Sequence, residues 1–115
     1  MTLGQAQKKF SKLFAQLILW SFDKGYEVVL GEVFRTPQQA AWYAAKGKGI
    51  ANSLHTVCLA ADINLFKNGS YLTQSEEYQE LGLYWESLDP NCNWGGRFDD
   101  GNHFSYSWFG MRGIK

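Results

Sequence analysis

The chain has 115 residues, and its 11 basic and 11 acidic side chains cancel to a formal net charge of zero at pH 7. This length suits one domain, so we expect residues 1–115 to form a single domain with its own core. Because no surplus of basic side chains is available to neutralise phosphates, we expect no nucleic-acid partner. No apolar run approaches the length that crosses a bilayer, so stable membrane insertion is not expected either.

Residues 5–24 predict an amphipathic helix. Apolar positions recur at helical spacing on one face, and Gly25 supplies a natural C-terminal stop. This face consists of Phe10, Leu13, Phe14, Leu17, Ile18 and Ser21. Lysine-bearing helices of this kind also bind membrane surfaces, but packing on the domain core is the favoured interpretation. The most apolar run, residues 17–20, is too short for a signal peptide, so we expect a chain made in the cytoplasm.

The middle of the chain predicts a strand, a helix and a second strand. Residues 26–35 are rich in Val, Leu and Phe, which is typical of a strand. A helix start follows, in which Thr36 is the N-cap, Pro37 takes the first helical position and Gln39 completes a capping box. After a Gly/Lys loop, residues 59–66 predict the second strand.

The last part of the chain predicts a hairpin, a helix and a final strand. Asn68-Gly69 favours the positive φ angles of a tight hairpin turn. Thr73 and Glu76 have the spacing of a capping box, and apolar residues at helical spacing follow. A Gly/Asn/Asp loop is expected over residues 91–102, before the final strand. Together the elements predict an α+β fold in which about three helices pack on a small, mainly antiparallel sheet.

His55 and His103 are the two histidines of the chain, and each has a carboxylate nearby, Asp62 and Asp100. Neutral imidazoles and a carboxylate suit zinc, and a catalytic zinc keeps three protein ligands and one open position for water. We therefore predict that His55, Asp62 and His103 bind Zn²⁺ and that Asp100 handles protons. A fully extended chain would separate the first histidine from Asp62 by roughly 23 Å, so the chain must bend between a loop and the following strand.

These residues resemble a known family of zinc peptidases. The pattern is Ser-x-His with an Asp after six further residues, then a distant Trp-Gly-Gly and Asp-x-x-His-Phe. It resembles the D-Ala-D-Ala carboxypeptidases and L-alanyl-D-glutamate endopeptidases, a group that includes bacterial resistance enzymes and compact phage endolysins. Segment 34–39 is similar to the family's arginine segment. The matching residues are Ser53, His55, Asp62, Trp94, Gly95, Gly96, Asp100, His103 and Phe104.

The resemblance implies a zinc-dependent peptidase that cleaves peptidoglycan stem peptides, most like an endolysin of the L-alanyl-D-glutamate type. D-Ala-D-Ala carboxypeptidase activity is the alternative within the family. Arg35, between a predicted strand and helix, would stabilise an oxyanion or hold a substrate carboxylate, although a surface ion pair is the other interpretation. Gln39, Ser53 and Trp94 are expected to contact the peptide. We expect a monomer that reaches the cell wall through export or release by another component.

The chain departs from the family pattern at two positions. Cys58 stands three residues after the first histidine, where the family usually has Gly. If the backbone there is left-handed, a residue other than Gly costs about 1 kcal/mol. Ser105 stands where the family often has Glu or Gln. Neither change removes a predicted ligand.

A different class of protein is also compatible with the sequence. His55, Cys58, Cys92 and His103 would supply the four ligands of a closed structural zinc site, which would make the chain a non-catalytic binding module. That interpretation leaves Asp62 without a role, and the open catalytic site is therefore favoured.

Overall fold

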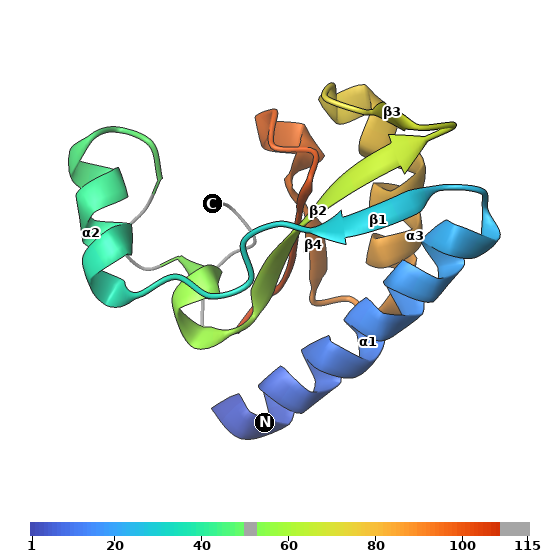
Figure 1. Cartoon of the computed structure of the whole chain (residues 1–115). Coiled ribbons are helices and arrows are strands. Elements are labelled where there is room, and N and C mark those ends of the chain that lie inside the picture. Colours follow the sequence, from blue (N-terminus) through green and yellow to red (C-terminus); the bar gives the residue numbers. More distant parts are fainter. Residues whose placement is uncertain (50–52, 109–115) are drawn as a thin grey trace.

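The computed structural model of the chain describes residues 1–49 and 53–108. Its strands are β1 (Glu27–Leu30), β2 (Ala60–Lys67), β3 (Ser70–Tyr71), β4 (Cys92–Trp94) and β5 (His103–Tyr106). They form a sheet with the order β1-β2-β5-β4, in which β3 pairs with the end of β2 and every described pair is antiparallel (Figure 1). The predicted antiparallel sheet is confirmed.

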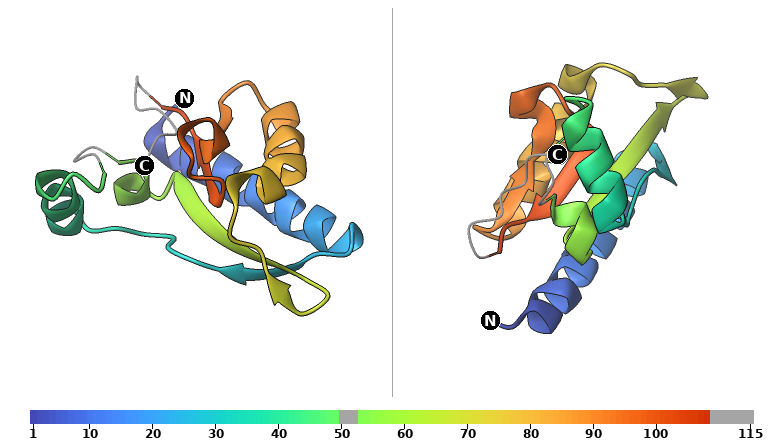
Figure 2. Two further views of the ribbon diagram at one scale, coloured as in Figure 1. Left: turned by 90° about the horizontal axis from the view of Figure 1, so that it is seen from above. Right: turned by 90° about the vertical axis from the view of Figure 1, so that its left-hand side faces the viewer.

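Within the described residues there are three α-helices, α1 (Leu3–Asp23), α2 (Pro37–Ala45) and α3 (Gln79–Leu88). Helices α1 and α3 pack together on one face of the sheet, whereas α2 stands to one side (Figure 1, Figure 2). This arrangement confirms the predicted α+β fold. Nowhere in residues 1–49 and 53–108 does a helix combine the length and the apolar character needed to cross a bilayer.

Helix α1 is fixed at its start by a capping box and along its length by the core. The Thr2 side chain accepts a hydrogen bond from the Gln5 N–H, and the Gln5 side chain accepts one from the Thr2 N–H. The predicted apolar face is buried apart from Ile18, which is partly covered, and Ala6 is buried in addition. The buried members of the predicted face are Phe10, Leu13, Phe14, Leu17 and Ser21. Burial of a side chain such as Leu17 contributes about 1.5–3 kcal/mol, so packing on the core holds this helix in place.

Trp85 occupies the centre of the core between α1 and β5. Its ring meets Phe10 edge-on with 5.7 Å between the ring centroids, and Phe104 at 6.3 Å. Its Nε1 donates to the carbonyl oxygens of Asn93 and Ser105, at 3.2 and 3.1 Å. Because its one polar atom is paired, this tryptophan is buried without an unsatisfied donor and fixes β4 and β5 relative to the helices.

Strand β2 separates the core from an open face of the sheet. Ala61, Ile63 and Leu65 are fully buried in the core, whereas Asp62 and Asn64 alternate with them and are partly exposed. Since successive side chains of a strand point to opposite faces, Asp62 and Asn64 lie on the face away from α1 and α3. The polar side chains of β2 are therefore available for chemistry.

Two local predictions are wrong. The capping box expected at Thr73 and Glu76 lies one residue further along, where Glu77 accepts hydrogen bonds from the N–H groups of Thr73 and Gln74. A 3₁₀ turn, η2 (Ser75–Tyr78), then precedes α3, because the chain tightens as it enters the helix. The expected loop 91–102 contains β4, whose pairing with β5 and burial against α3 outweigh a composition typical of loops.

Candidate active site

Strands β2 and β5 bring Asp62 and His103 side by side. The two residues are partners in the sheet, and His103 Nδ1 lies 3.4 Å from Asp62 Oδ1. The segment that follows β1 continues to pair with Asp62. The Gly31 N–H donates to the Asp62 carbonyl, and the Asp62 N–H donates to the Glu32 carbonyl, both at 2.8 Å. A Cβ at Gly31 would lie 3.0 Å from the Asp62 Cβ, so glycine leaves room for the carboxylate.

His55 reaches the same place because the chain turns through a 3₁₀ helix, η1 (Leu54–Val57), before β2. The buried Ser53 caps this turn, and its Oγ accepts a hydrogen bond from the His55 N–H at 3.2 Å. The turn ends at Cys58, whose φ of 56° and ψ of 39° are left-handed. The expected bend between His55 and Asp62 is confirmed. The condition stated for Cys58 is also met, because the backbone is left-handed at the position where the resembled family has glycine.

Three ligand atoms form a nearly equilateral triangle. His55 Nε2 lies 3.2 Å from His103 Nδ1, and each nitrogen lies 3.4 Å from Asp62 Oδ1. A tetrahedral zinc with ligands at about 2.0–2.1 Å places its ligand atoms about 3.3–3.4 Å apart. Both histidines are 1% exposed. Spacing, burial and donor chemistry therefore fit a zinc ion with three protein ligands, and this is the group with metal-binding geometry in the described part of the chain.

Asp62 is ionised at neutral pH. Burial raises the pKa of its carboxyl group, but hydrogen bonds and positive charge from His103 and His55 outweigh that effect and bring the pKa down to about 2. A carboxylate held in its charged form is a suitable ligand for a divalent cation, because it offsets part of the charge on the ion.

The ring nitrogens that point away from the triangle have different surroundings. His55 Nδ1 lies 3.4 Å from the Val33 carbonyl oxygen and 3.7 Å from Oε1 of Glu32. An N–H on this nitrogen would donate to the carbonyl, which fixes the tautomer that leaves Nε2 free for a metal. His103 Nε2 is buried and has no hydrogen-bond partner among the described residues.

Arg35 lies beside the two histidines. Its guanidinium group pairs with Glu32 and lies over the Tyr43 ring, 4.9 Å from the centroid, and its backbone N–H donates to the His55 carbonyl. Its Nε and Nη1 are buried without a hydrogen-bond partner in the part of the chain that the structure describes. An unpaired buried donor costs about 1–3 kcal/mol, so a further acceptor at these two nitrogens would be stabilising. The ion pair considered from the sequence is thus present, and it leaves the Nε and Nη1 donors of Arg35 without a partner among the described residues.

These side chains surround a cavity of about 190 Å³, lined by Arg35, Lys48, His55, Asp62, Asp100 and His103. No sequence pattern indicates a role for Lys48, because a lysine in a Gly/Lys loop carries no signal of what folds against it. The same holds for Glu32, which lies three residues before Arg35 and reaches His55 because the segment after β1 folds against η1.

Asp100 lies next to the triangle. Its Oδ2 is 3.9 Å from His103 Nδ1. The turn that carries it is tight: the Asp100 N–H donates to the Gly95 carbonyl and the His103 N–H donates to the Asp100 carbonyl, both at 3.0 Å. A Cβ at Gly95 would come within 2.4 Å of the Asp100 carbonyl oxygen and 2.9 Å of the His103 Cβ. Glycine at this position therefore lets the carboxylate and the histidine approach each other.

The three residues expected to contact substrate do not line this cavity. Gln39 is exposed on α2, where its side chain closes the capping box with Thr36. Ser53 is buried beneath the turn that carries His55. Substrate contact by Gln39, Ser53 and Trp94 stays a prediction.

Trp94 is packed between two glycines. A Cβ at either Gly82 or Gly96 would lie 2.1 Å from its ring, and its Nε1 donates to the Gly101 carbonyl at 2.7 Å. The ring is 9% exposed. Its position supports the turn that leads to Asp100, which is a structural task that the Trp-Gly-Gly pattern alone does not reveal.

The two cysteines stand apart from the ligand group. Cys58 is exposed, and Cys92 is buried in β4 opposite Tyr106. Burial raises the pKa of the Cys92 thiol to about 12, so it does not supply a thiolate at neutral pH. The metal-binding group of the described residues contains no cysteine, and the closed zinc site considered above is not assembled in them.

No family model matches the chain, and no curated protein matches its sequence. Solved structures of two peptidases nevertheless share its fold. One is the L-Ala D-Glu endopeptidase ChiX of Serratia marcescens, with a TM-score of 0.72 and 16% identity, covering 87% of this chain and 79% of that chain.

The second structure is the vancomycin resistance D,D-pentapeptidase VanY from the VanB-type resistance cassette, a mutant in complex with Zn(II). It has a TM-score of 0.57 and 19% identity, and the match covers 85% of this chain and 70% of that chain. At these identities the likeness concerns the fold. The fold is that of the peptidase group that the sequence resembles, as predicted.

Proposed function

We propose that the chain is a zinc-dependent peptidase that acts on peptidoglycan stem peptides and cleaves the L-alanyl-D-glutamate bond. The supporting observation is the triangle of His55, Asp62 and His103, whose edges of 3.2 to 3.4 Å suit tetrahedral zinc. The choice of bond follows the greater structural similarity to the L-Ala D-Glu endopeptidase, with a TM-score of 0.72 against 0.57 for the D,D-pentapeptidase. An endolysin is the biological role that suits this activity.

When bound, Zn²⁺ supplies a Lewis acid for the scissile carbonyl and an acidified water as nucleophile. Asp100 takes a proton from the attacking water and delivers it to the leaving amine as the C–N bond breaks. Its Oδ2 is 3.9 Å from the Nδ1 of His103, so it acts at the reacting centre without being one of the three ligands. Asp62 stays ionised as a ligand because its pKa is about 2.

Arg35 stabilises the negative charge that develops on the carbonyl oxygen. Its buried Nε and Nη1 have no partner among the described residues, and Arg35 lines the same cavity as the proposed ligands. Its pairing with Glu32 and its contact with Tyr43 fix the guanidinium before substrate arrives. Donors that are already oriented toward developing charge lower the barrier without reorganisation.

D-Ala-D-Ala carboxypeptidase activity is the second candidate. Arg35 and Lys48 line one cavity, and this pair of cations also suits the terminal carboxylate of such a substrate. The likeness to the zinc-bound D,D-pentapeptidase supports this alternative. Both candidates use the same metal and the same proton carrier, so product analysis is needed to separate them.

Mass spectrometry of diaminopimelate-type peptidoglycan, incubated with the chain with and without a zinc chelator, tests the proposal. Chelator-sensitive release of stem peptides that lack L-Ala is the expected result. Loss of a terminal D-Ala alone would identify the carboxypeptidase. Intact peptidoglycan with zinc bound to the protein would leave only a non-catalytic zinc module.

A further inference from the structure

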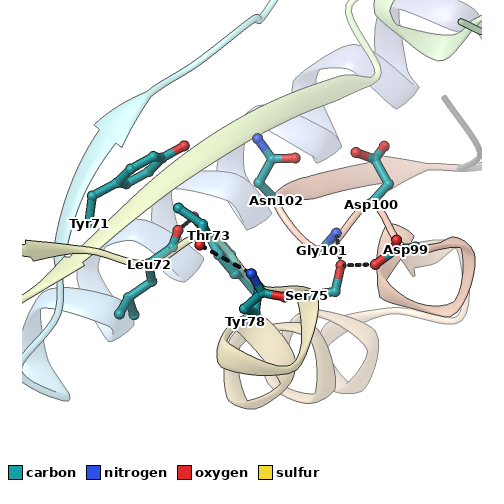
Figure 3. Close-up of a pocket in the computed structure, with 10 residues that line it drawn as sticks. Tyr71, Leu72, Thr73, Ser75, Tyr78, Asp99, Asp100, Gly101 and Asn102 are labelled. Carbon is teal, nitrogen blue, oxygen red and sulfur yellow. Dashed lines mark hydrogen bonds between the residues drawn. The ribbon is translucent and has the colours of Figure 1, made fainter.

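A second cavity, of about 290 Å³, adjoins the candidate active site and shares Asp100 with it. It lies between the segment that follows the β2–β3 hairpin and the turn that precedes β5 (Figure 3). In this view Tyr71, Asn102 and Asp100 follow one another along β2, and their polar ends project to the same side. The cavity therefore extends the active site along the open face of the sheet.

Ser75 connects the two walls of this cavity. Its Oγ accepts a hydrogen bond from the Gly101 N–H at 3.0 Å and donates to Asp99 Oδ1 at 3.2 Å, as Figure 3 shows for the second contact. A Cβ at Gly101 would lie 2.6 Å from the Ser75 Cα, so only glycine permits this approach. The cavity is thus formed before any ligand binds, as binding pockets usually are.

Among the described residues, the lining of the cavity is mostly polar and contains no cationic side chain. Carboxylates come from Asp99 and Asp100, so a ligand that carries its own carboxylate is repelled. A neutral ligand with several hydroxyl and amide groups matches the remaining donors and acceptors. Hydroxyl and amide groups are supplied by Tyr71, Thr73, Gln74, Ser75 and Asn102.

Tyr71 supplies a fixed aromatic surface at the far end of the cavity. Its hydroxyl donates to the Asn64 side-chain oxygen at 3.3 Å, and its ring lies 5.2 Å from the Phe66 ring. The side chain is nevertheless 52% exposed. A flat ring with a polar tip, held in place and open to solvent, is suited to stacking against the face of a sugar.

We infer that this cavity binds an N-acetylated sugar of peptidoglycan on the amino-terminal side of the scissile bond. The inference rests on the proposed L-alanyl-D-glutamate cleavage. The sugar is neutral when its lactyl group is joined to L-Ala through an amide, which suits the cavity of Asp99 and Asp100. The D-Glu carboxylate belongs to the other cavity, where Arg35 and Lys48 are its cationic partners. Cationic side chains line the active-site cavity, whereas the charged groups in the described lining of the second cavity are carboxylates, and this difference sets the direction of the substrate.

The test compares two substrates with the zinc-loaded full chain: N-acetylmuramoyl-L-alanyl-γ-D-glutamyl-diaminopimelate and its sugar-free N-acetyl counterpart. We expect kcat/KM to favour the muramoyl substrate by roughly threefold to tenfold, the range that one aromatic stacking contact supplies. The Tyr71→Ala variant should lose most of this preference. Phe22→Ala, at an exposed aromatic position of α1 outside both cavities, should keep it.

Equal kcat/KM values in the wild type, or a preference that survives in Tyr71→Ala, would overturn the inference. If neither substrate is cleaved, the proposed function fails, and an NMR titration with the neutral disaccharide of N-acetylglucosamine decides the sugar site alone. Shifts at Tyr71 and Asn102 would support the site, and their absence would reject it.

Discussion

The two segments that carry the histidines are built alike but fixed by different means. Each includes a single 3₁₀ turn that ends in a left-handed residue other than glycine: η1 at Cys58 and η3 (Gly95–Phe98) at Asp99, with φ of 56° and 57°. In the first segment, the Nδ1 of His55 lies near the Val33 carbonyl and the Glu32 carboxylate. His103 Nε2 has no hydrogen-bond partner among the described residues, and this ring is positioned by strand register and by contact with the turn.

This difference divides the site into a polar side and a packed side. On the polar side, the groups near Nδ1 determine the tautomer of His55. Substitution of one of these groups should therefore reduce metal affinity without abolishing it. On the packed side, the position of His103 depends on close packing against Gly95, where an added Cβ would lie 2.9 Å from the His103 Cβ. A change in shape there should disrupt the fold and the metal site together.

The largest effects are expected from the metal ligands and the proton carrier. His103→Ala removes one of three ligands and should abolish zinc binding, measured by metal analysis after dialysis, because two ligands do not hold a catalytic zinc.

Asp100→Ala should keep zinc and lower kcat by about 10²–10⁴-fold, the range of general acid–base catalysis. An Asp100→Ala enzyme with ordinary turnover would refute the proton-carrier role.

Gly95→Ala should have the next largest effect. The added Cβ would come within 2.4 Å of the Asp100 carbonyl oxygen, so the turn must move, and we expect a loss of about 2–3 kcal/mol in the free energy of unfolding. Urea denaturation measures it. Gly4→Ala is the matched control, because nothing lies within 4 Å of its Cβ and it sits in the first turn of α1. Equal free energies of unfolding for the two variants would show that the turn at Gly95 has room for a Cβ, against the close packing inferred here.

Glu32→Gln tests the polar side of the site. The substitution keeps the size of the side chain but removes the charge that pairs with Arg35 and lies 3.7 Å from His55 Nδ1. We expect zinc affinity to fall about tenfold, as for other partners of metal-bound histidines, with little change in stability. Competition with a chromogenic chelator measures this affinity. Glu27→Gln, on the exposed part of β1, should leave it unchanged.

Much of this site was predictable from the sequence, because its proposed ligands are rare residues in recognisable patterns. The sequence pattern predicts a site of His55, Asp62, His103 and Asp100, and the structure brings their side chains together around one cavity. The fold class followed from apolar periodicity and turn residues.

What escaped prediction depends on contacts between distant segments. Lys48 and Glu32 lie at the site because a loop and a strand end fold against η1, and no local pattern encodes that contact. Strand β4 was missed because its three residues are too few for a periodic signal and gain their stability from β5 and α3. Trp94 fits the family pattern, yet its packing between Gly82 and Gly96 depends on how α3 meets the turn after β4, which no local pattern encodes.

The smallest expected effect concerns Cys58, where the sequence predicted a cost and the structure supplies the left-handed backbone that causes it. Cys58→Gly should stabilise the fold by about 0.5–1 kcal/mol, because glycine adopts this conformation without steric strain. Cys58→Ala removes the thiol but keeps the Cβ, so it should give no such gain. Thermal unfolding of the three proteins separates the two explanations. Equal stabilisation by glycine and alanine would mean that the exposed thiol, rather than the backbone, is what destabilises this turn.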